Sequence, residues 1–193
     1  GLSNINCFTA LRFASGIIKF PSTDSNVAYQ SGSSFSFVVP TGIASLQRIL
    51  VVASATSSAF EFSVNVQSFN AGSTGNIIDL DAPSVLINPS DLSGGVNLST
   101  DFTYGSSSAE GIYKIRIGSP SKTYVVYTSE LSAKIPALSQ FGVVLETSAN
   151  HRWTVEKYHS IPGMDAFTSV PLFDNTYFTS VSNSRHRTFT TSP

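Results

Sequence analysis

The segment from residue 60 to residue 67, FEFSVNVQ, alternates strictly between apolar and polar residues. A period of two is that of a β-strand with one buried face and one solvated face. The pattern predicts a strand over 60–69 with a dry side that lines a hydrophobic core. That side carries Phe60, Phe62, Val64 and Val66.

Similar short runs, bounded by Gly, Pro, Asn and Ser, recur along the chain. They predict strands at 6–13, 16–20, 33–40, 46–55, 96–104, 111–118, 122–129, 140–147 and 151–158, with shorter runs at 76–80 and 84–88. The run 46–55 has a continuous apolar centre, which is typical of a strand buried on both faces. Ser148-Ala149-Asn150 has the length of a hairpin link.

Helical signal is sparse. In the segment 129–141, Leu131, Ile135 and Leu138 have helical spacing, but Pro136 limits any helix to one or two turns. The segment 165–173 fits neither helix nor strand. About ten short strands with turn signals every ~8–12 residues predict an all-β fold, an antiparallel β-sandwich over residues 1–158.

Residues 159–193 have a different character, with prolines, several aromatic residues and no clean alternation. We expect this segment to be an extended, irregular C-terminal tail that packs on the surface of its own subunit or of a neighbouring one. Its apolar rings need such a surface to cover them: Phe167, Phe173, Tyr177, Phe178 and Phe189.

Charged residues make up 12% of the chain and hydrophobic residues 41%, whereas an average soluble domain has roughly 25% charged residues. The apolar content argues against disorder, and no run approaches the ~20 residues of a membrane helix. A surface poor in charge suits an extracellular protein or an assembly subunit, because interface cores are depleted of charge. The net charge of −1 gives no overall attraction to nucleic acid.

The single cysteine, Cys7, has no partner for an internal disulfide, so stability must come from the core. The N-terminal sequence GLSNIN lacks the pattern of a secretion signal. A start at Gly1 indicates either a product of processing or a remnant of cloning.

No residue constellation indicates catalysis, and we expect the chain to be no enzyme and to use no cofactor or metal. There is no G-x-S-x-G, H-x-x-x-H or C-x-x-C motif. We interpret His151 as an exposed hairpin residue. His159 and His186 are expected to be solvated or to contact a neighbouring subunit. A β-sandwich hydrolase with a site built from separate strands stays open as an alternative.

Two acidic residues, Asp79 and Asp81, share a face if they lie on a strand, and with Asp91 they are candidates for a Ca²⁺ site. A role as turn residues before Ala82-Pro83 is favoured. For Trp153, core burial is favoured over stacking on a sugar.

The basic residues offer two further features. Lys114 and Arg116 are predicted to project from one strand face, opposite Ile115 and Ile117, as a solvated surface. The cluster Arg185-His186-Arg187 is a weak candidate for RNA or an acidic partner. Asn97-Leu98-Ser99 is a glycosylation sequon of a kind that occurs often by chance.

In its length, low charge, Ser/Thr/Phe-rich strands, proline-bounded loops and aromatic C-terminal segment SIPGMDAFTSVPLFDNTYF, the chain resembles the jelly-roll coat proteins of picornavirus-like RNA viruses. The small coat proteins of comovirus-like plant viruses are similar in the same way. A start at Gly1 is similar to the product of polyprotein cleavage, and the basic arm of many plant-virus coats is missing.

The resemblance implies an eight-stranded jelly roll of two four-stranded sheets, and a structural role in a capsid or spike within the virion. Its partners would be copies of itself and other coat chains in an icosahedral shell, joined through strand-end loops and the tail. Surface loops would be places for a host receptor or vector, and direct nucleic-acid binding would be weak or absent. The alternative is an extracellular, lectin-like module using Trp153, Tyr104 or Tyr127.

Overall fold

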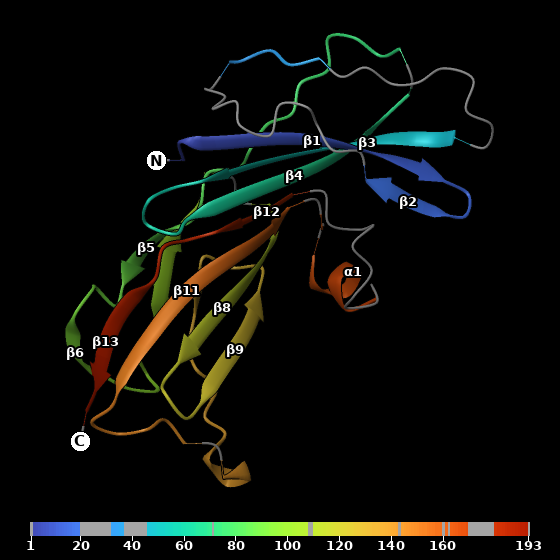
Figure 1. Cartoon of the computed structure of the whole chain (residues 1–193). Helices are drawn as coiled ribbons and strands as arrows, with labels where there is room; N and C mark the ends of the chain where they lie inside the picture. Colours follow the sequence, from blue (N-terminus) through green and yellow to red (C-terminus); the bar gives the residue numbers. More distant parts are fainter. Residues whose placement is uncertain are drawn as a thin grey trace.

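The computed structural model describes residues 2–19, 32–36, 46–70, 72–107, 110–142, 144–159, 161, 163–169 and 180–192. These residues form an all-β fold in which two sheets pack against each other as an antiparallel sandwich (Figure 1). No helix in this part of the chain has the length and hydrophobicity required to span a membrane.

The larger sheet has ten strands among the described residues. They are β1 (Asn4–Phe13), β2 (Gly16–Lys19), β3 (Leu46–Thr56), β4 (Phe62–Phe69), β6 (Ser93–Val96), β8 (Ile112–Gly118), β9 (Thr123–Thr128), β11 (Asn150–His159), β12 (Ser180–Asn183) and β13 (Arg187–Thr191). The sheet runs β2-β1-β3-β4-β12-β11-β8-β9, and every pair in that order is antiparallel. β6 joins β13 in parallel.

The smaller sheet packs behind β8 and β11 and has the order β10-β7-β5. Its strands are β5 (Val85–Asn88), β7 (Phe102–Gly105) and β10 (Ser132–Ala133). The sandwich expected from the sequence is confirmed. The ten and three strands differ, however, from the two four-stranded sheets that the resemblance implied, because one sheet extends through both halves of the molecule.

Several local predictions were wrong. Residues 33–36 and 144–147 are not strands, and the run 96–104 is divided between β6 and β7. In the segment 129–141 we expected a helix of one or two turns at most, because of Pro136. The segment holds β10 and a one-turn 3-10 helix, Ser139–Phe141, and no α-helix. The ambiguous segment 165–173 begins with helix α1 (Met164–Ser169), and its remaining residues lie outside the described ones.

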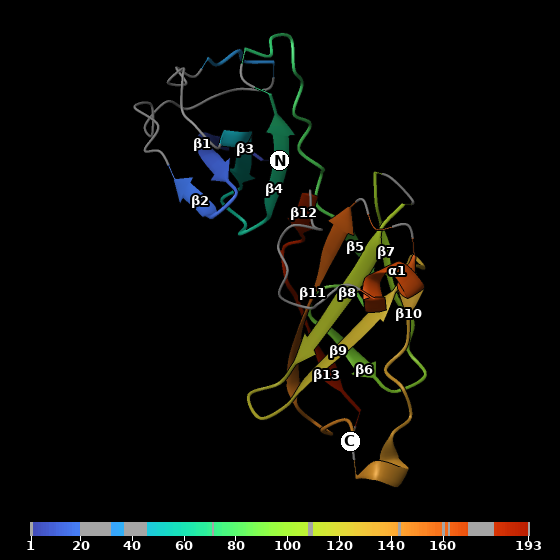
Figure 2. The same cartoon turned by 90° about the vertical axis from the view of Figure 1, so that its right-hand side faces the viewer.

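The prediction of an irregular C-terminal tail was wrong for residues 180–191. These residues form β12 and β13, which lie one after the other along the same edge of β11. β12 also pairs with β4, so it lies between the N-terminal and C-terminal parts of the sheet. Figure 2 shows β1–β4 and the sandwich of the later strands as two halves that meet at this strand. Phe173, Tyr177 and Phe178 lie outside the described residues.

A single serine maintains the pairing where β12 passes into β13. The backbone N–H of Ser184 donates to the carbonyl of Val155 at 2.8 Å. The N–H of Val155 in turn donates to the side-chain Oγ of Ser184 at 2.9 Å. The hydroxyl thus takes the place of a backbone carbonyl at a one-residue irregularity in the ladder. The N–H groups of Ser184 and Val155 are both hydrogen-bonded at the point where β12 passes into β13.

The core of the sandwich lies between the two sheets. Trp153, completely buried on β11, meets Phe102 of β7 edge to face, with ring centroids 5.3 Å apart. This burial confirms the favoured interpretation of Trp153. The other buried members of this core are Leu86, Val96, Tyr104, Tyr113, Ile115, Ile117, Ile135, Val155 and Phe189.

The prediction for FEFSVNVQ was wrong in its choice of buried face. On β4 the polar residues Ser63 and Asn65 are buried, Phe62 and Val64 are half-buried, and Phe60 is 78% exposed in the turn before the strand. The reason is a segment without regular structure, residues 77–81, that covers the inner face. There the carbonyl of Asp79 accepts a hydrogen bond from Asn65 Nδ2 at 2.6 Å.

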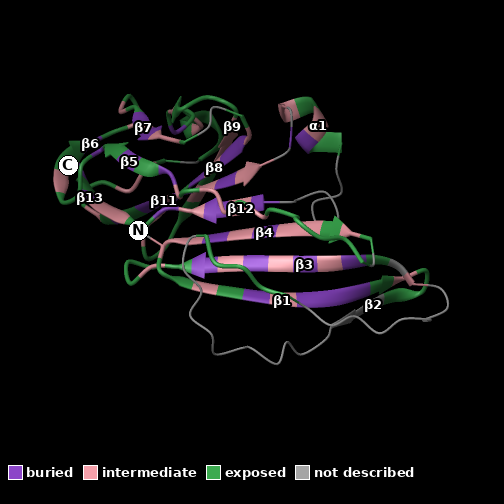
Figure 3. Cartoon of the chain, turned by 90° about the horizontal axis from the view of Figure 1, so that it is seen from above, coloured by how far each residue is buried: buried purple, intermediate pink, exposed green. Residues whose placement is uncertain are grey.

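The same segment completes a second, smaller core in the N-terminal half. Ile78 packs against the buried side chains of Leu11, Ile49 and Val51. Along β3, buried positions alternate with half-buried ones (Figure 3), so the continuous apolar run corresponds to one fully and one partly covered face.

We expect Ser184→Ala to lower the free energy of unfolding by about 1–3 kcal/mol, because the N–H of Val155 would be left buried without an acceptor. Thr190→Ala, at an exposed position of β13, is the control and should change it by less than ~0.5 kcal/mol. Urea unfolding followed by the fluorescence of Trp153, the only tryptophan, measures both. Equal effects of the two substitutions would contradict the role given to Ser184.

Candidate functional site

The interpretation of His151 as an exposed hairpin residue was wrong. It is 1% exposed and stacks on Phe189, with ring centroids 5.1 Å apart and an interplanar angle of 10°. The register explains the error: His151 lies directly opposite Phe189 on the inner face of the larger sheet. Its side chain therefore belongs to the core.

The three aspartates considered for a Ca²⁺ site make separate contacts. Asp81 lies beside His159 and Ser180, whereas Asp91 accepts hydrogen bonds from the backbone N–H and the hydroxyl of Thr188. Asp79 contributes its carbonyl to Asn65. In the part of the chain that the structure describes, no group of three or more His, Cys, Asp or Glu gathers as a metal site would require.

Of the aromatic residues considered for sugar stacking, two are buried and one is half-buried. Tyr104 is 2% exposed and its hydroxyl donates to the carbonyl of Glu130 at 2.6 Å; burial raises the pKa of this phenol. Trp153 is in the core. Tyr127 packs on Phe167 of α1, with ring centroids 5.0 Å apart. Tyr104 and Trp153 are therefore closed to a sugar, whereas Tyr127 is half-buried.

A half-buried polar cluster occupies the junction of the two halves of the larger sheet. His159 Nε2 lies 2.6 Å from Asp81 Oδ2, and the hydroxyl of Ser180 donates to the same oxygen at 3.2 Å. Asp81 comes from the irregular covering segment, His159 from β11 and Ser180 from β12. The cluster therefore fastens three separate parts of the chain to one another.

Lys157 belongs to the same junction and is completely buried. Its ammonium lies 5.9 Å from the centroid of the Tyr113 ring, within the range of a cation–π contact. Burial lowers the pKa of Lys157, and the charges of Asp81 and Glu110 oppose that shift. Gly111 packs closely against this side chain. A Cβ at position 111 would lie 3.2 Å from Lys157 Cε and 2.7 Å from the carbonyl oxygen of Tyr158.

The basic residues divide into bound and exposed ones. Lys114 projects outward as predicted and pairs with Glu156 at 3.0 Å, while Arg116 is exposed on the same face. In the cluster 185–187, Arg187 donates to the carbonyl of Ile87 at 2.9 Å, and Arg185 and His186 are exposed. Asn97 of the sequon is also exposed, and its side-chain oxygen accepts a hydrogen bond from the backbone N–H of Ser99.

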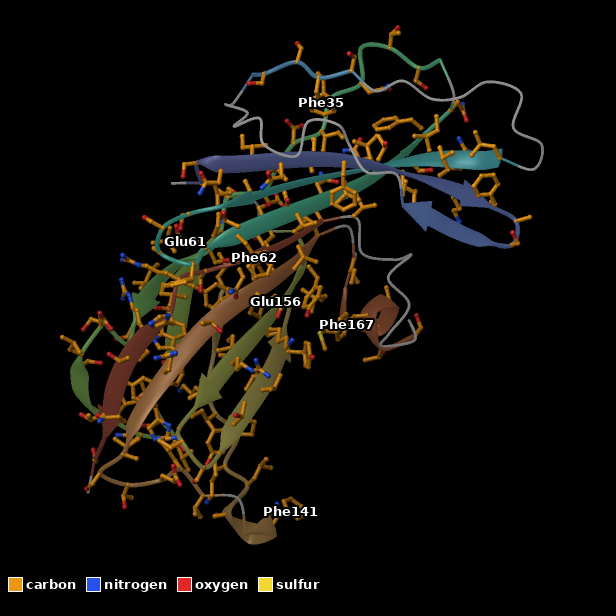
Figure 4. All side chains as sticks on the ribbon, in the orientation of Figure 1. Phe35, Glu61, Phe62, Phe141, Glu156 and Phe167 are labelled. Atoms are coloured by element: carbon orange, nitrogen blue, oxygen red, sulfur yellow. The ribbon has the colours of Figure 1, made fainter. Side chains whose placement is uncertain are left out.

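Two turns display large apolar side chains on a left-handed backbone, a feature that the sequence analysis missed. The first is the turn 57–61 between β3 and β4, where Phe60 has φ +62°. Ser57 Oγ accepts the N–H groups of Ala59 and Glu61 and donates to the carboxylate of Glu61 at 3.0 Å. Figure 4 labels Glu61 and Phe62 at the β4 side of this turn. These bonds hold Phe60 in solvent on a rigid turn.

The second turn, before β6, presents Leu92 with φ +60° and 83% of its surface exposed. Its N–H donates to the carbonyl of Thr188 on β13 at 2.7 Å. The preceding residue, Asp91, accepts the N–H of Thr188 at 2.7 Å, and this bond is the main reason that the pKa of Asp91 is lowered. Leu92 is thus fixed from both sides, although nothing covers its side chain in the described part of the chain.

Both turns lie on the side of the molecule that is at the left in Figures 1 and 3, the first where β3 passes into β4 and the second beside β13. Val85 and Ile87 of β5 are exposed there as well, on the outer face of the smaller sheet. In the sequence, the exposure of Phe60 and Leu92 is indicated only by the turn-forming residues that precede them, Ser57-Ser58 and Asp91. We call Phe60, Val85, Ile87 and Leu92 the apolar display.

Comparison of the chain with protein-family models, with curated proteins and with solved structures gives no match.

We expect the protein to lose stability as the pH falls below about 6.5, because burial depresses the pKa of His159 below its usual value; nearby Lys157 adds to the effect and Asp81 opposes it. With a folded pKa below the unfolded one, the unfolded state binds more protons in the interval between them, and stability decreases through that interval. His159→Gln should flatten this part of the pH profile.

Urea unfolding at a series of pH values between about 7 and 5 measures the effect. His186→Gln, at an exposed position, is the control and should keep the wild-type profile. Carboxylates with a lowered pKa, such as Asp91 and Glu146, titrate at more acidic pH in all three proteins. A wild-type profile that is flat in this range would contradict the role of His159.

Proposed function

We propose that this chain is a structural subunit of a multi-subunit protein shell, the capsid of a non-enveloped virus, and that it associates through strand-end turns. The apolar display carries the proposal. The resemblance to picornavirus-like coat proteins supports it from the sequence side. No catalytic residue takes part in this function, which depends on shape and on the chemistry of the surface.

The left-handed backbone at Phe60 and Leu92 makes the display informative. For residues other than Gly, this conformation costs roughly 1–2 kcal/mol, and Gly, Asn or Asp are the usual occupants. Exposing a large apolar side chain brings no compensating stability to an isolated subunit. Burial of the same side chain against a partner contributes about 1.5–3 kcal/mol. An association surface thus gives a physical reason for both residues.

The composition agrees with this reading. Only 12% of the residues are charged, and subunit interfaces are depleted of charge at their centres while aromatic residues are enriched. The apolar display also lies at turns and on a strand of the smaller sheet, away from the buried core. We assign no role in association to residues 180–191, since they are needed inside the sheet.

The first experiment is the mass of the native species, by light scattering together with negative-stain microscopy of the same sample. Rings or shells, formed by the chain alone or with a companion coat chain, are the expected result. A 20.6 kDa monomer at every concentration, also in the presence of companion chains, would overturn the proposal.

The display itself can be tested by Phe60→Asn and Leu92→Asn. Asn tolerates the left-handed backbone, so each variant should keep or gain up to about 1 kcal/mol of unfolding free energy. Association should weaken by about tenfold or more per substitution. Ile77→Asn is the matched control, since Ile77 is 75% exposed without a positive φ.

Sedimentation velocity over a concentration series measures association, and urea unfolding measures stability. Variants that associate like the wild type would exclude these two turns from the interface. Weakened association combined with a large loss of stability would instead point to a structural role for the two side chains.

A further inference from the structure

The outer face of β8, β11 and β12, turned away from the smaller sheet, carries two arginines that form no ion pair with an acidic residue in the described part of the chain. We define this face by Arg116, Arg152, Thr154 and Asn183. Arg116 lies opposite Thr154, and Arg152 lies opposite Gly118, so the two arginines are diagonal neighbours on adjacent strands. Such neighbours are about 7–8 Å apart. Both guanidinium groups are exposed.

A shallow hollow of about 580 Å³ lies on this face. Gly118 contributes to it, because it places no side chain opposite Arg152. The hollow is lined by Arg116, Gly118, Ser119, Pro120, Asn150, His151, Arg152, Thr154, Asn183, His186 and Thr188, and none of these residues is acidic. His151 reaches it from the core and is buried, while His186 is exposed at its edge.

The acidic residues nearest to the hollow already have partners. Glu156, higher on the same face and labelled in Figure 4, pairs with Lys114 at 3.0 Å and accepts the Tyr158 hydroxyl at 2.7 Å. Glu146 accepts the hydroxyl of Ser121, and the hydroxyls of Ser119 and Ser121 lower its pKa. Asp91 is bound by Thr188.

Among the described residues, no acidic side chain lies within ion-pair distance of Arg116 or Arg152. Two exposed guanidinium groups at this spacing suit an anionic ligand with more than one charged group, since guanidinium binds sulfate and phosphate oxygens through paired N–H donors.

The surroundings distinguish between classes of polyanion. Binding of single-stranded nucleic acid relies on exposed rings for base stacking. Among the described residues, the rings beside this face are Tyr127 and Tyr158, which are half-buried and pack on Phe167. The amide groups of Asn150 and Asn183 and the hydroxyl of Thr154 match the hydroxyl groups of sugars. We propose that this face binds a sulfated polysaccharide, with Arg116 and Arg152 as its sulfate-binding residues.

This inference does not depend on the proposed function, since the face contains none of the residues of the apolar display. If the chain does form a shell, repetition of the face over many copies would multiply a weak single-site affinity. The site tested is the same in both cases, and a monomer suffices to measure it.

The experiment measures binding of a fluorescent heparin oligosaccharide to the full chain, with de-N-sulfated heparin and poly(U) RNA as competing probes. The double variant Arg116→Gln/Arg152→Gln should bind about ten- to a hundredfold more weakly. Arg48→Gln removes the same kind of charge from β3, where Arg48 donates to Asn70, and should bind like the wild type. Circular dichroism confirms that each variant is folded.

A second variant, Thr154→Glu, places a carboxylate between the two arginines and should weaken binding to a similar degree, whether or not the double variant folds. Equal losses in Arg48→Gln would reveal general ion exchange and overturn the site. Absence of heparin binding by the wild type would overturn it as well. Tighter binding of poly(U) than of heparin would replace the polysaccharide by RNA and overturn the proposed ligand class.

Discussion

The strand formed by residues 180–191 is the constraint on which the rest of the structure depends. Its first part, β12, hydrogen-bonds to β4 on one side and to β11 on the other. In the part of the chain that the structure describes, this is the ladder that joins the N-terminal strands to the later ones. Ser184 allows its second part, β13, to continue along β11 and to complete the sandwich core with Phe189. Pairing across more than a hundred residues is entropically demanding and comes late in chain synthesis.

The polar junction follows from this arrangement. Where β12 meets β4, the inner face carries small polar residues, Ser63 and Ser182, which lie directly opposite each other. Small side chains let the irregular segment 77–81 approach the sheet closely. A buried polar face requires hydrogen-bonding or charged partners. The segment supplies one to Asn65 through the carbonyl of Asp79 and one to Ser180 through the carboxylate of Asp81. The junction is therefore held by polar contacts that respond to pH, whereas the sandwich is held by aromatic packing.

At the two turns, the exposed side chains of Phe60 and Leu92 lower the stability of the isolated subunit, because both residues have a left-handed backbone. The backbone at Phe60 and Leu92 would be less strained with Gly or Asn. Both turns are nevertheless held by backbone N–H groups that donate to Ser57 Oγ, to the carboxylate of Asp91 and to the carbonyl of Thr188. Rigid turns reduce the entropy that a partner must overcome when it binds. The basic face is different in kind: it lies on regular strands, where β-pairing already fixes the spacing of Arg116 and Arg152.

The amino-acid sequence by itself determined the all-β class, the burial of Trp153 and the outward direction of Lys114 and Arg116. These features depend only on the period of two within one strand and on turn residues beside it. The sequence did not reveal β12 and β13, because SVSN and RTFTT show little contrast between two faces and their partners lie far away in the chain.

Only the tertiary structure decided which face of a strand became the inside. His151 is buried because Phe189 lies opposite it, and Ser63 and Asn65 are buried because the segment 77–81 covers them. Phe60 continues an apolar alternation but belongs to a turn. The alternation of a strand defines two faces without stating what will cover each one. Segments that are distant in the sequence decide which face is covered, because they pack against one face and leave the other in solvent.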